Sequence, residues 1–219
     1  MTGRPRSASD EAIFEAMAAV VTASGPAQLT LAAVAGRVGL SAPALAQRFG
    51  SKQGLLAAFA AREAVAVAGT LAAARAGGTD PVQALVAVLA ALPGAVTTRD
   101  GLANNLAFLQ MDLTDPELRP HAVAHSRALR DGIAALVTDA VQAGLLAADT
   151  VPGALAADLW AAYCGAMVTW AIDGTGTLPD WIAAHLERIL APHRTYAKHD
   201  GSGSTRAPGR PAKAACSSP

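Results

Sequence analysis

The sequence has few aromatic residues, few cysteines and no net charge. Of its 219 residues, 52% are hydrophobic but only 4% are aromatic. The apolar content is far above that of disordered chains, so the chain has enough material for a packed core. The two cysteines, Cys164 and Cys216, are too few for a disulfide framework and lack metal-ligand spacing.

The sequence also lacks an uninterrupted apolar run of the roughly 20 residues that a membrane-spanning helix needs. Its mean hydropathy is positive, at +0.31. Charged side chains nevertheless interrupt the most apolar stretches, at Arg62 and Glu63, at Asp112 and Asp115, and at Asp158 and Asp173. The N-terminus is polar and has no apolar signal core. We therefore expect a cytoplasmic protein that does not contact a membrane.

Alanine, by contrast, makes up about a quarter of the chain. It has the highest helix propensity and packs poorly in sheets, which argues against a β-sandwich or a β-barrel. Apolar residues recur at helical spacing near the N-terminus, at Ile13, Phe14, Met17, Val20 and Val21. No segment shows a strand signal. The sequence predicts an all-α fold of about nine helices.

Capping residues, prolines and glycines mark where these helices begin and end. Ser7 or Ser9 caps the first helix, and Gly25-Pro26 ends it. Later helices are expected from Thr30 to Gly39, from Ser41 to Gly50, from about Lys52 to Ala76, after Asp80, around Leu102 to Leu109, from Asp115 to Ala143, from Thr150 to Asp173, and from Asp180 to Leu190.

The zero net charge is the sum of unequal segments. Residues 1–52 contain five basic and three acidic groups, a charge of +2. Residues 53–193 contain seven basic and thirteen acidic groups, a charge of −6, and residues 194–219 carry +4. A basic head and tail thus flank an acidic body, which hints at a nucleic-acid contact at one end.

Residues 30–49 are typical of two short helices joined by a tight turn at Gly39. Val34, Val38 and Leu45 supply apolar contacts that hold such helices at a steep angle. The second helix then projects far enough to enter a DNA major groove. A simple αα-hairpin that only packs is the alternative, and spacing alone does not separate the two.

The next residues carry a more specific signal. The segment Leu45-Ala-Gln-Arg-Phe49-Gly-Ser-Lys52-Gln-Gly-Leu-Leu56 resembles the end of the DNA-binding domain in the tetracycline-repressor (TetR) family of transcriptional regulators. In that family the recognition helix runs into a Phe-x-Ser-Lys-x-x-Leu-Leu junction. The upstream segment Leu31–Ser41 is similar to the family's second helix and turn. The resemblance covers roughly residues 10–57.

The resemblance implies a ligand-responsive regulator, expected to be a repressor, that binds a near-palindromic DNA operator as a homodimer. A small-molecule effector would release the DNA. It implies a helix-turn-helix domain over residues 1–52 and a ligand-binding and dimerisation domain over residues 53–195. Separately, the Gly, Ser, Pro, Arg and Lys content of the C-terminal end, which has almost no large apolar residue, predicts a disordered basic tail over residues 196–219.

By position, the resemblance also implies a set of DNA contacts: Thr30, Ser41, Ala42, Ala44, Gln47, Arg48 and Lys52. Glutamine can bond adenine in two places, and arginine can reach guanine or phosphate. Ala46 departs from the family pattern, which often has tyrosine there. Arg4 and Arg6 form either a minor-groove arm or a solvated terminus.

The last two helices are the family's dimer helices. Ala157, Ala161 and Gly165, at spacings of four, form a shallow strip that allows a close approach of helices. Internal packing of this strip is the alternative.

The scarce large side chains of the body are candidates for an effector pocket: Phe108, Met111, Trp160, Tyr163, Met167 and Trp170. Polar candidates are Asn104, Asn105 and Gln110. The low charge of this set favours an apolar or aromatic effector. The alternative is that these side chains only fill the core.

Catalytic and cofactor signals are missing. There is no Gly-rich phosphate loop, nucleophile elbow or paired-carboxylate motif, so we expect no enzymatic activity and no cofactor. His121 and His125 have zinc-compatible spacing, but helix contacts explain them as well. Cys164 is expected to be a small buried hydrophobe. The rival to a regulator is an all-α enzyme or small-molecule carrier whose helix-turn-helix is structural.

Overall fold

The computed structural model describes residues 8–78, 80–94 and 96–195. This part of the chain contains nine α-helices, two short 3-10 helices, and no strand beyond one isolated bridge between Leu146 and Arg194. The expected all-α fold is confirmed. Arg4, Arg6, Ser7, Cys216 and the expected tail over residues 196–219 lie outside the described residues.

The helices follow the expected order. They are α1 (Asp10–Ser24), η1 (Pro26–Gln28), α2 (Leu31–Val38), α3 (Ala42–Phe49), α4 (Lys52–Ala76), α5 (Pro81–Ala91), α6 (Arg99–Thr114), α7 (Arg119–Gln142), α8 (Pro152–Asp173), α9 (Leu178–Leu190) and η2 (Ala191–His193).

Side-chain caps fix the starts of the first four α-helices. The hydroxyls of Ser9, Thr30, Ser41 and Ser51 each accept a hydrogen bond from the backbone N–H three residues later, at 3.0 to 3.3 Å. Gly39 ends α2 with a φ of 69°, a left-handed conformation that few other residues adopt. These local signals are readable in the sequence, which explains why the helix boundaries there were predictable.

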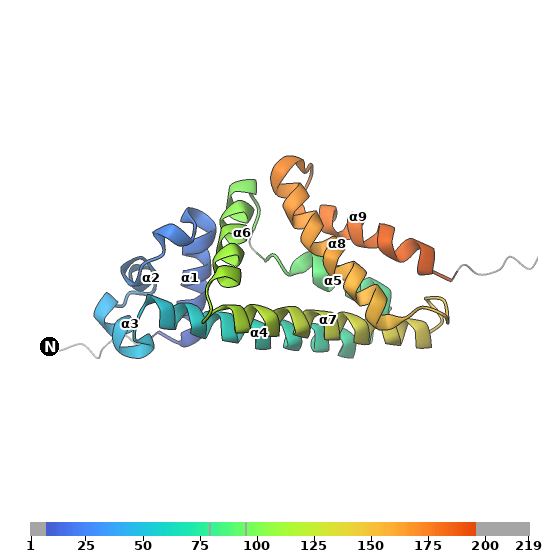
Figure 1. Ribbon diagram of the computed structural model, residues 1–219, viewed down its shortest axis with the longest axis horizontal. Coiled ribbons are helices and arrows are strands. Elements are labelled where there is room, and N and C mark those ends of the chain that lie inside the picture. Colours follow the sequence, from blue (N-terminus) through green and yellow to red (C-terminus); the bar gives the residue numbers. More distant parts are fainter. Residues whose placement is uncertain (1–7, 79, 95, 196–219) are drawn as a thin grey trace, which may run out of the picture.

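The helices form an elongated molecule with a head at one end (Figure 1). Helices α1, α2 and α3 gather at the N-terminal end. Helices α4 and α7 pack side by side along the molecule, and α5, α8 and α9 lie at the other end. Helix α6 stands between the two ends, in contact with both α1 and α8.

The apolar side chains bury themselves in two clusters. The head cluster is built on Ile13, Met17, Leu29, Val34, Leu45, Leu55, Leu56 and Leu118. The body cluster is built on Val67, Leu71, Leu85, Leu89, Ile133, Leu159, Ile182 and others. Helix α4 contributes its first turn to the head cluster and its second half to the body cluster. It therefore contributes to both cores.

The expected start of the seventh helix at Asp115 needs a small correction, because α7 begins at Arg119. The Asp115 carboxylate accepts hydrogen bonds from the backbone N–H groups of Glu117 and Leu118, at 2.8 and 3.3 Å. This cap holds residues 116–118 in a turn ahead of the helix proper. The sequence locates the cap correctly but not the extra turn.

Two helices, α4 and α8, are long and apolar enough to cross a membrane by length and composition alone. The charged residues Arg62, Glu63 and Asp158 therefore do not make these two helices too polar to pass this test, contrary to the expectation from the sequence. Both helices pack within the bundle, α4 along α7, and α8 against α7 and α9. Core helices pass the same test, so this is weak evidence for a membrane protein.

Candidate nucleic-acid interface and effector cavity

Helix α3 is held against the head by one side and presents the other to solvent. Leu45 is fully buried, and Phe49 packs against the head cluster with its ring 5.9 Å from that of Phe14. Ala44, Gln47 and Arg48 are exposed. Ser41 is exposed and Ala42 half-buried at the start of the same helix. The exposed face of α3 is thus free to meet a ligand.

Two of the basic candidates are already engaged within the head. The Arg48 guanidinium pairs with Asp10 at 2.6 Å and donates to the Ala8 carbonyl at 2.7 Å, which ties α3 to the start of α1. The Lys52 ammonium donates to the Pro26 carbonyl at 3.3 Å. Both side chains therefore help position the helices, whether or not they also reach a phosphate.

Thr30 and Arg37 complete the polar groups of the helix-turn-helix. The Thr30 hydroxyl accepts its bond from Ala33, which leaves its proton for another acceptor. Arg37, in the last turn of α2, is exposed and has no ion pair with another described residue. Arg37 is absent from the DNA contacts expected from the sequence, because no motif position distinguishes it from an ordinary surface cation.

A cavity of about 490 Å³ lies between α4, α5, α7 and α8. Its walls combine apolar side chains with charged and polar ones. They are Arg62, Glu63, Ala66, Val67, Thr70, Val88, Ala91, Leu92, His125, Leu129 and Tyr163. The size is within the range of small-molecule sites.

The structure does not bring the six large pocket candidates together. Tyr163 alone lines this cavity, with Trp160 stacked on it at 5.5 Å between ring centroids. Phe108 and Met111 pack instead against the head cluster. Met167 and Trp170 pack in the body cluster, where Trp170 is buried.

The polar candidates on α6 have other partners. The side-chain amides of Asn104 and Asn105 both donate to Thr22 of α1, at 3.0 and 3.1 Å, and therefore join α6 to the head. Gln110 is exposed. None of the three lines the cavity.

The cavity's charged groups were missed by sequence reasoning. Arg62, Glu63, Ala66, Val67 and Thr70 follow one side of α4, a helical spacing that the sequence shows. Which side of α4 faces α5, α7 and α8 depends on packing between distant segments, which the spacing does not reveal.

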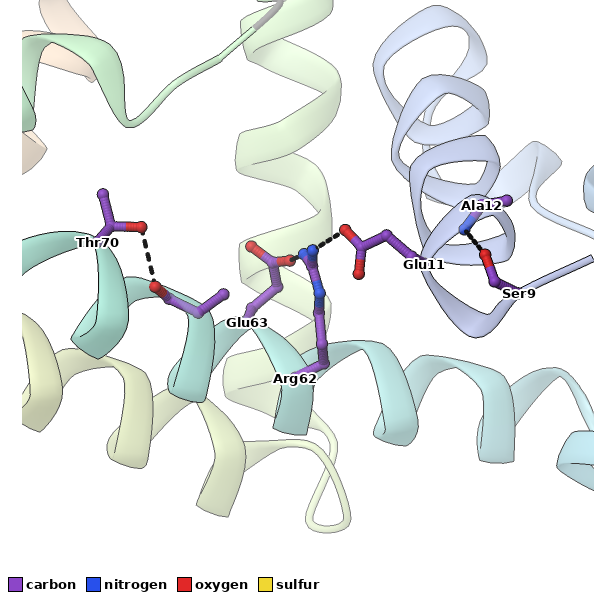
Figure 2. Close-up of polar contacts among 7 residues, drawn as sticks. Ser9, Glu11, Ala12, Arg62, Glu63 and Thr70 are labelled. Carbon is purple, nitrogen blue, oxygen red and sulfur yellow. Dashed lines mark hydrogen bonds and ion pairs between the residues drawn. The ribbon is translucent and has the colours of Figure 1, made fainter. Parts of the chain in front are cut away.

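Arg62 links the cavity wall to the head. Its guanidinium bonds to the carboxylates of both Glu63, on the same helix, and Glu11, on α1 (Figure 2). Farther along α4, the Thr70 hydroxyl donates to the Ala66 carbonyl at 2.9 Å, which satisfies it within the helix. Arg62 is thus the polar contact in this region that joins α4 to α1.

Burial keeps two other cavity groups neutral. It lowers the pKa of His125 below its usual value, although bonding to the Glu63 backbone and the Glu63 charge act in the opposite direction. Burial also raises the pKa of the Tyr163 hydroxyl well above its usual range. The fixed charges of the cavity wall at neutral pH are therefore those of Arg62 and Glu63.

His121 and His125 do not form a metal site with acidic neighbours. Among the residues that the structure describes, no group of three His, Cys, Asp or Glu side chains is arranged to hold a metal ion. Cys164 is half-buried, and burial raises its thiol pKa to about 11, so the thiol stays protonated at neutral pH.

The small-residue strip of α8 lies on the surface. Ala157, Ala161 and Gly165 are all exposed, so internal packing does not account for them. Two exposed apolar side chains continue the strip toward the end of α8: Val168 is 45% exposed and Ile172 70% exposed. Together these five residues, the α8 strip, form an apolar face with no cover in the described chain.

Comparison with protein families agrees with this geometry. The model "Bacterial regulatory proteins, tetR family" matches residues 13–59, and the model "Tetracyclin repressor-like, C-terminal domain" matches residues 105–186. The chain belongs to the TetR family of transcriptional regulators. It is a DNA-binding regulator with a helix-turn-helix head and a ligand-binding body. Members of this family are regulators rather than typical enzymes.

Solved structures of TetR-type regulators share the fold. A TetR regulator from Haloarcula marismortui superposes with a TM-score of 0.70 at 17% identity, covering 85% of this chain and 98% of its own. SmeT, the repressor of the Stenotrophomonas maltophilia multidrug efflux pump SmeDEF, gives 0.62 at 22% identity, covering 94% and 98%.

A transcriptional regulator from Saccharomonospora viridis, solved in complex with choline, gives a TM-score of 0.66 at 21% identity and covers 83% of this chain and 95% of its own. No curated protein sequence matches the chain significantly.

Proposed function

We propose that this protein is a cytoplasmic, homodimeric repressor that binds a near-palindromic operator and leaves it when an effector occupies the cavity. The observation that carries the proposal is the exposed face of α3. The start of this helix is capped and its opposite side is buried in the head. We assign residues 1–52 to DNA binding, 53–195 to effector binding and dimerisation, and 196–219 to a basic tail. We assign no enzymatic activity to it.

Within the head, we assign base contacts to Ser41, Ala42, Ala44 and Gln47, because they lie along the exposed or half-exposed side of α3. Thr30 and Arg37 are assigned to phosphates, since the hydroxyl proton and the guanidinium have no acceptor among the described residues. Arg48 and Lys52 are assigned to the DNA backbone as well, while they hold α3 and α4 in place.

Operator titration tests these assignments. Sequences selected from random DNA by the purified protein supply the operator. Gln47→Ala should weaken operator binding by about 1–3 kcal/mol and relax sequence preference at one position. Arg37→Ala should weaken binding to all sequences and reduce the salt slope by about 1.

Gln142→Ala, at the far end of α7, is the matched control and should bind like the wild type. Selection that recovers no common sequence, with no retention on DNA at low salt, would contradict a DNA-binding role and favour the carrier alternative.

The α8 strip supports the proposed dimer. A partner's α8 that packs against Ala157, Ala161 and Gly165 would bury Val168 and Ile172, which otherwise remain exposed. Small residues let two such helices approach closely, and a two-fold arrangement would place two α3 helices on successive major grooves.

Gly165→Leu should therefore convert the dimer to a monomer. A Cβ at Gly165 meets no other atom within 4 Å, so the folded monomer accommodates the larger side chain. Leucine also has the higher helix propensity by somewhat under 1 kcal/mol. Light scattering should report twice 22.0 kDa for the wild type and 22.0 kDa for the variant.

Gly69→Leu, also in open space on α4, is the matched control and should stay dimeric. A monomeric wild type at micromolar concentration, or a dimeric Gly165→Leu variant, would rule out this interface.

The solved relatives support a small-molecule effector without identifying it. One of them, SmeT, has been solved with triclosan and another regulator with choline, which are an aromatic and a cationic ligand respectively. We propose that the cavity between α4, α5, α7 and α8 is the effector site here. Its apolar walls suit the apolar or aromatic part of an effector, and its charged wall must meet a polar part.

A further inference from the structure

The ion pairs at the cavity wall contain more carboxylates than guanidinium groups. One guanidinium, that of Arg62, serves two carboxylates, those of Glu63 and Glu11. His125, the other basic group that faces Glu63, is kept neutral by burial. The cluster of Arg62, Glu63 and Glu11 therefore has a net charge of −1, and the acid on the cavity side is Glu63.

An excess carboxylate in a partly buried cavity attracts a cation. Charges near a protein surface interact several times more strongly than in bulk water, so Glu63 favours a positively charged group over a neutral or negative one. An anionic ligand would have to compete with both carboxylates for Arg62.

The rest of the cavity suits an organic cation rather than a bare ion. Val67, Leu92 and Leu129 provide apolar walls. Tyr163 provides an aromatic ring, backed by Trp160 at an interplanar angle of 19°. Aromatic faces attract organic cations, particularly where water is excluded.

We propose that the cavity binds an organic cation whose positive group pairs with Glu63, and that this binding is transmitted to α1 through Arg62 and Glu11. The inference rests on the proposed effector role of the cavity. When the cationic group of a ligand pairs with Glu63, Arg62 no longer shares its charge between two carboxylates. It then pairs with Glu11 alone. The guanidinium then shifts toward α1, whose first residue also pairs with Arg48 of the recognition helix.

Binding to the free protein tests the site without DNA. Phenyltrimethylammonium is the probe, and tert-butylbenzene, which has the same shape without the charge, is its control. Calorimetry on the full chain should show the cation binding at least about tenfold tighter than the hydrocarbon, a difference of about 1.4 kcal/mol. Glu63→Gln should abolish this preference, and Glu63→Asp, which keeps the charge, should retain part of it.

Glu117→Gln, an exposed acid in the turn before α7, is the matched control and should change neither affinity. Equal binding of the two probes by the wild type, or a cation preference that survives in a folded Glu63→Gln variant, overturns the site.

Operator binding with and without phenyltrimethylammonium tests the transmission. The wild type should lose at least about fivefold in operator affinity when the cation is present. Glu11→Gln leaves Arg62 to pair with Glu63 alone and should therefore weaken cation binding in calorimetry. Its operator response is measured at a saturating concentration of the cation, where it should be less than about twofold. Glu15→Gln, on the same helix and exposed, should respond like the wild type.

A full response in Glu11→Gln overturns the relay. If no variant binds any operator, the proposed DNA-binding function fails, while calorimetry still decides whether the cation site exists.

Discussion

Asp112 is a carboxylic acid in a place that offers one of its oxygens no hydrogen bond. It lies on α6, is 9% exposed, and its Oδ1 has no partner among the described residues. Burial, with a smaller contribution from the nearby charge of Asp115, raises its pKa from 3.8 to about 6. The folded protein therefore holds this proton more tightly than the unfolded chain does.

The sign of the pH dependence follows from that shift. Asp112 contributes stability that is fully present below about pH 4 and is lost as the pH rises through 6. This rise in the pKa of Asp112 corresponds to about 3 kcal/mol of folding free energy at neutral pH. Asp112→Asn should remove this penalty and be more stable than the wild type at pH 7 by about 1–3 kcal/mol.

Urea unfolding at pH 4 and pH 7 measures the effect. The advantage of Asp112→Asn should shrink toward zero at pH 4, because the wild-type carboxyl is then protonated too. Asp100→Asn, in the exposed first turn of α6, is the control and should show no such gain. An advantage that does not change with pH would mean that the Asp112 charge is not the cause.

At the scale of helices, α4 and α7 approach closely because Gly132 of α7 has no side chain. A Cβ built there would lie 2.6 to 3.1 Å from atoms of Leu71, which is itself buried on α4. Gly132→Ala should therefore force the two helices apart and destabilise the protein by about 1–3 kcal/mol, despite the higher helix propensity of alanine.

Gly69→Ala is the comparison, because nothing lies within 4 Å of its Cβ and only propensity changes. It should stabilise the protein by up to about 1 kcal/mol. Thermal melting should move the two variants in opposite directions, and a Gly132→Ala variant that melts like Gly69→Ala would show that the contact relaxes at no cost.

At the scale of the whole molecule, the head could be predicted from the sequence and the cavity could not. Caps at Thr30, Ser41 and Ser51 are local, so the head and its resemblance to a known family could be predicted from residues within a few positions. The cavity depends on how α4, α5, α7 and α8 rotate against one another. Aromatic size suggested Phe108 as a ligand contact, yet its position relative to α1 and Phe59 places it in the head cluster.

The charge of the proposed effector site also depends on helix packing that the sequence does not reveal. The low charge of the six aromatic and sulfur-containing candidates pointed to an apolar effector. Arg62 and Glu63 change that expectation only once their side of α4 is known to face the cavity. Adjacent opposite charges on a helix are common on solvated surfaces, so the pair carried no signal by itself.

Helix α4 is part of both cores: its first turn packs in the head cluster and its later turns pack in the body cluster. The head should therefore not fold without α4. A fragment of residues 1–52 lacks Leu55, Leu56 and Leu118, which are fully or almost fully buried in the head. That fragment should not fold alone, and its circular dichroism should lack the helical signal of the head in the full chain.

The intact chain should instead unfold in a single transition, with equal calorimetric and van't Hoff enthalpies. Because α4 belongs to both cores, the two ends are expected to melt as one cooperative unit. In that case the protein cannot release DNA by unfolding its head locally. The head must move away from the DNA as a folded body.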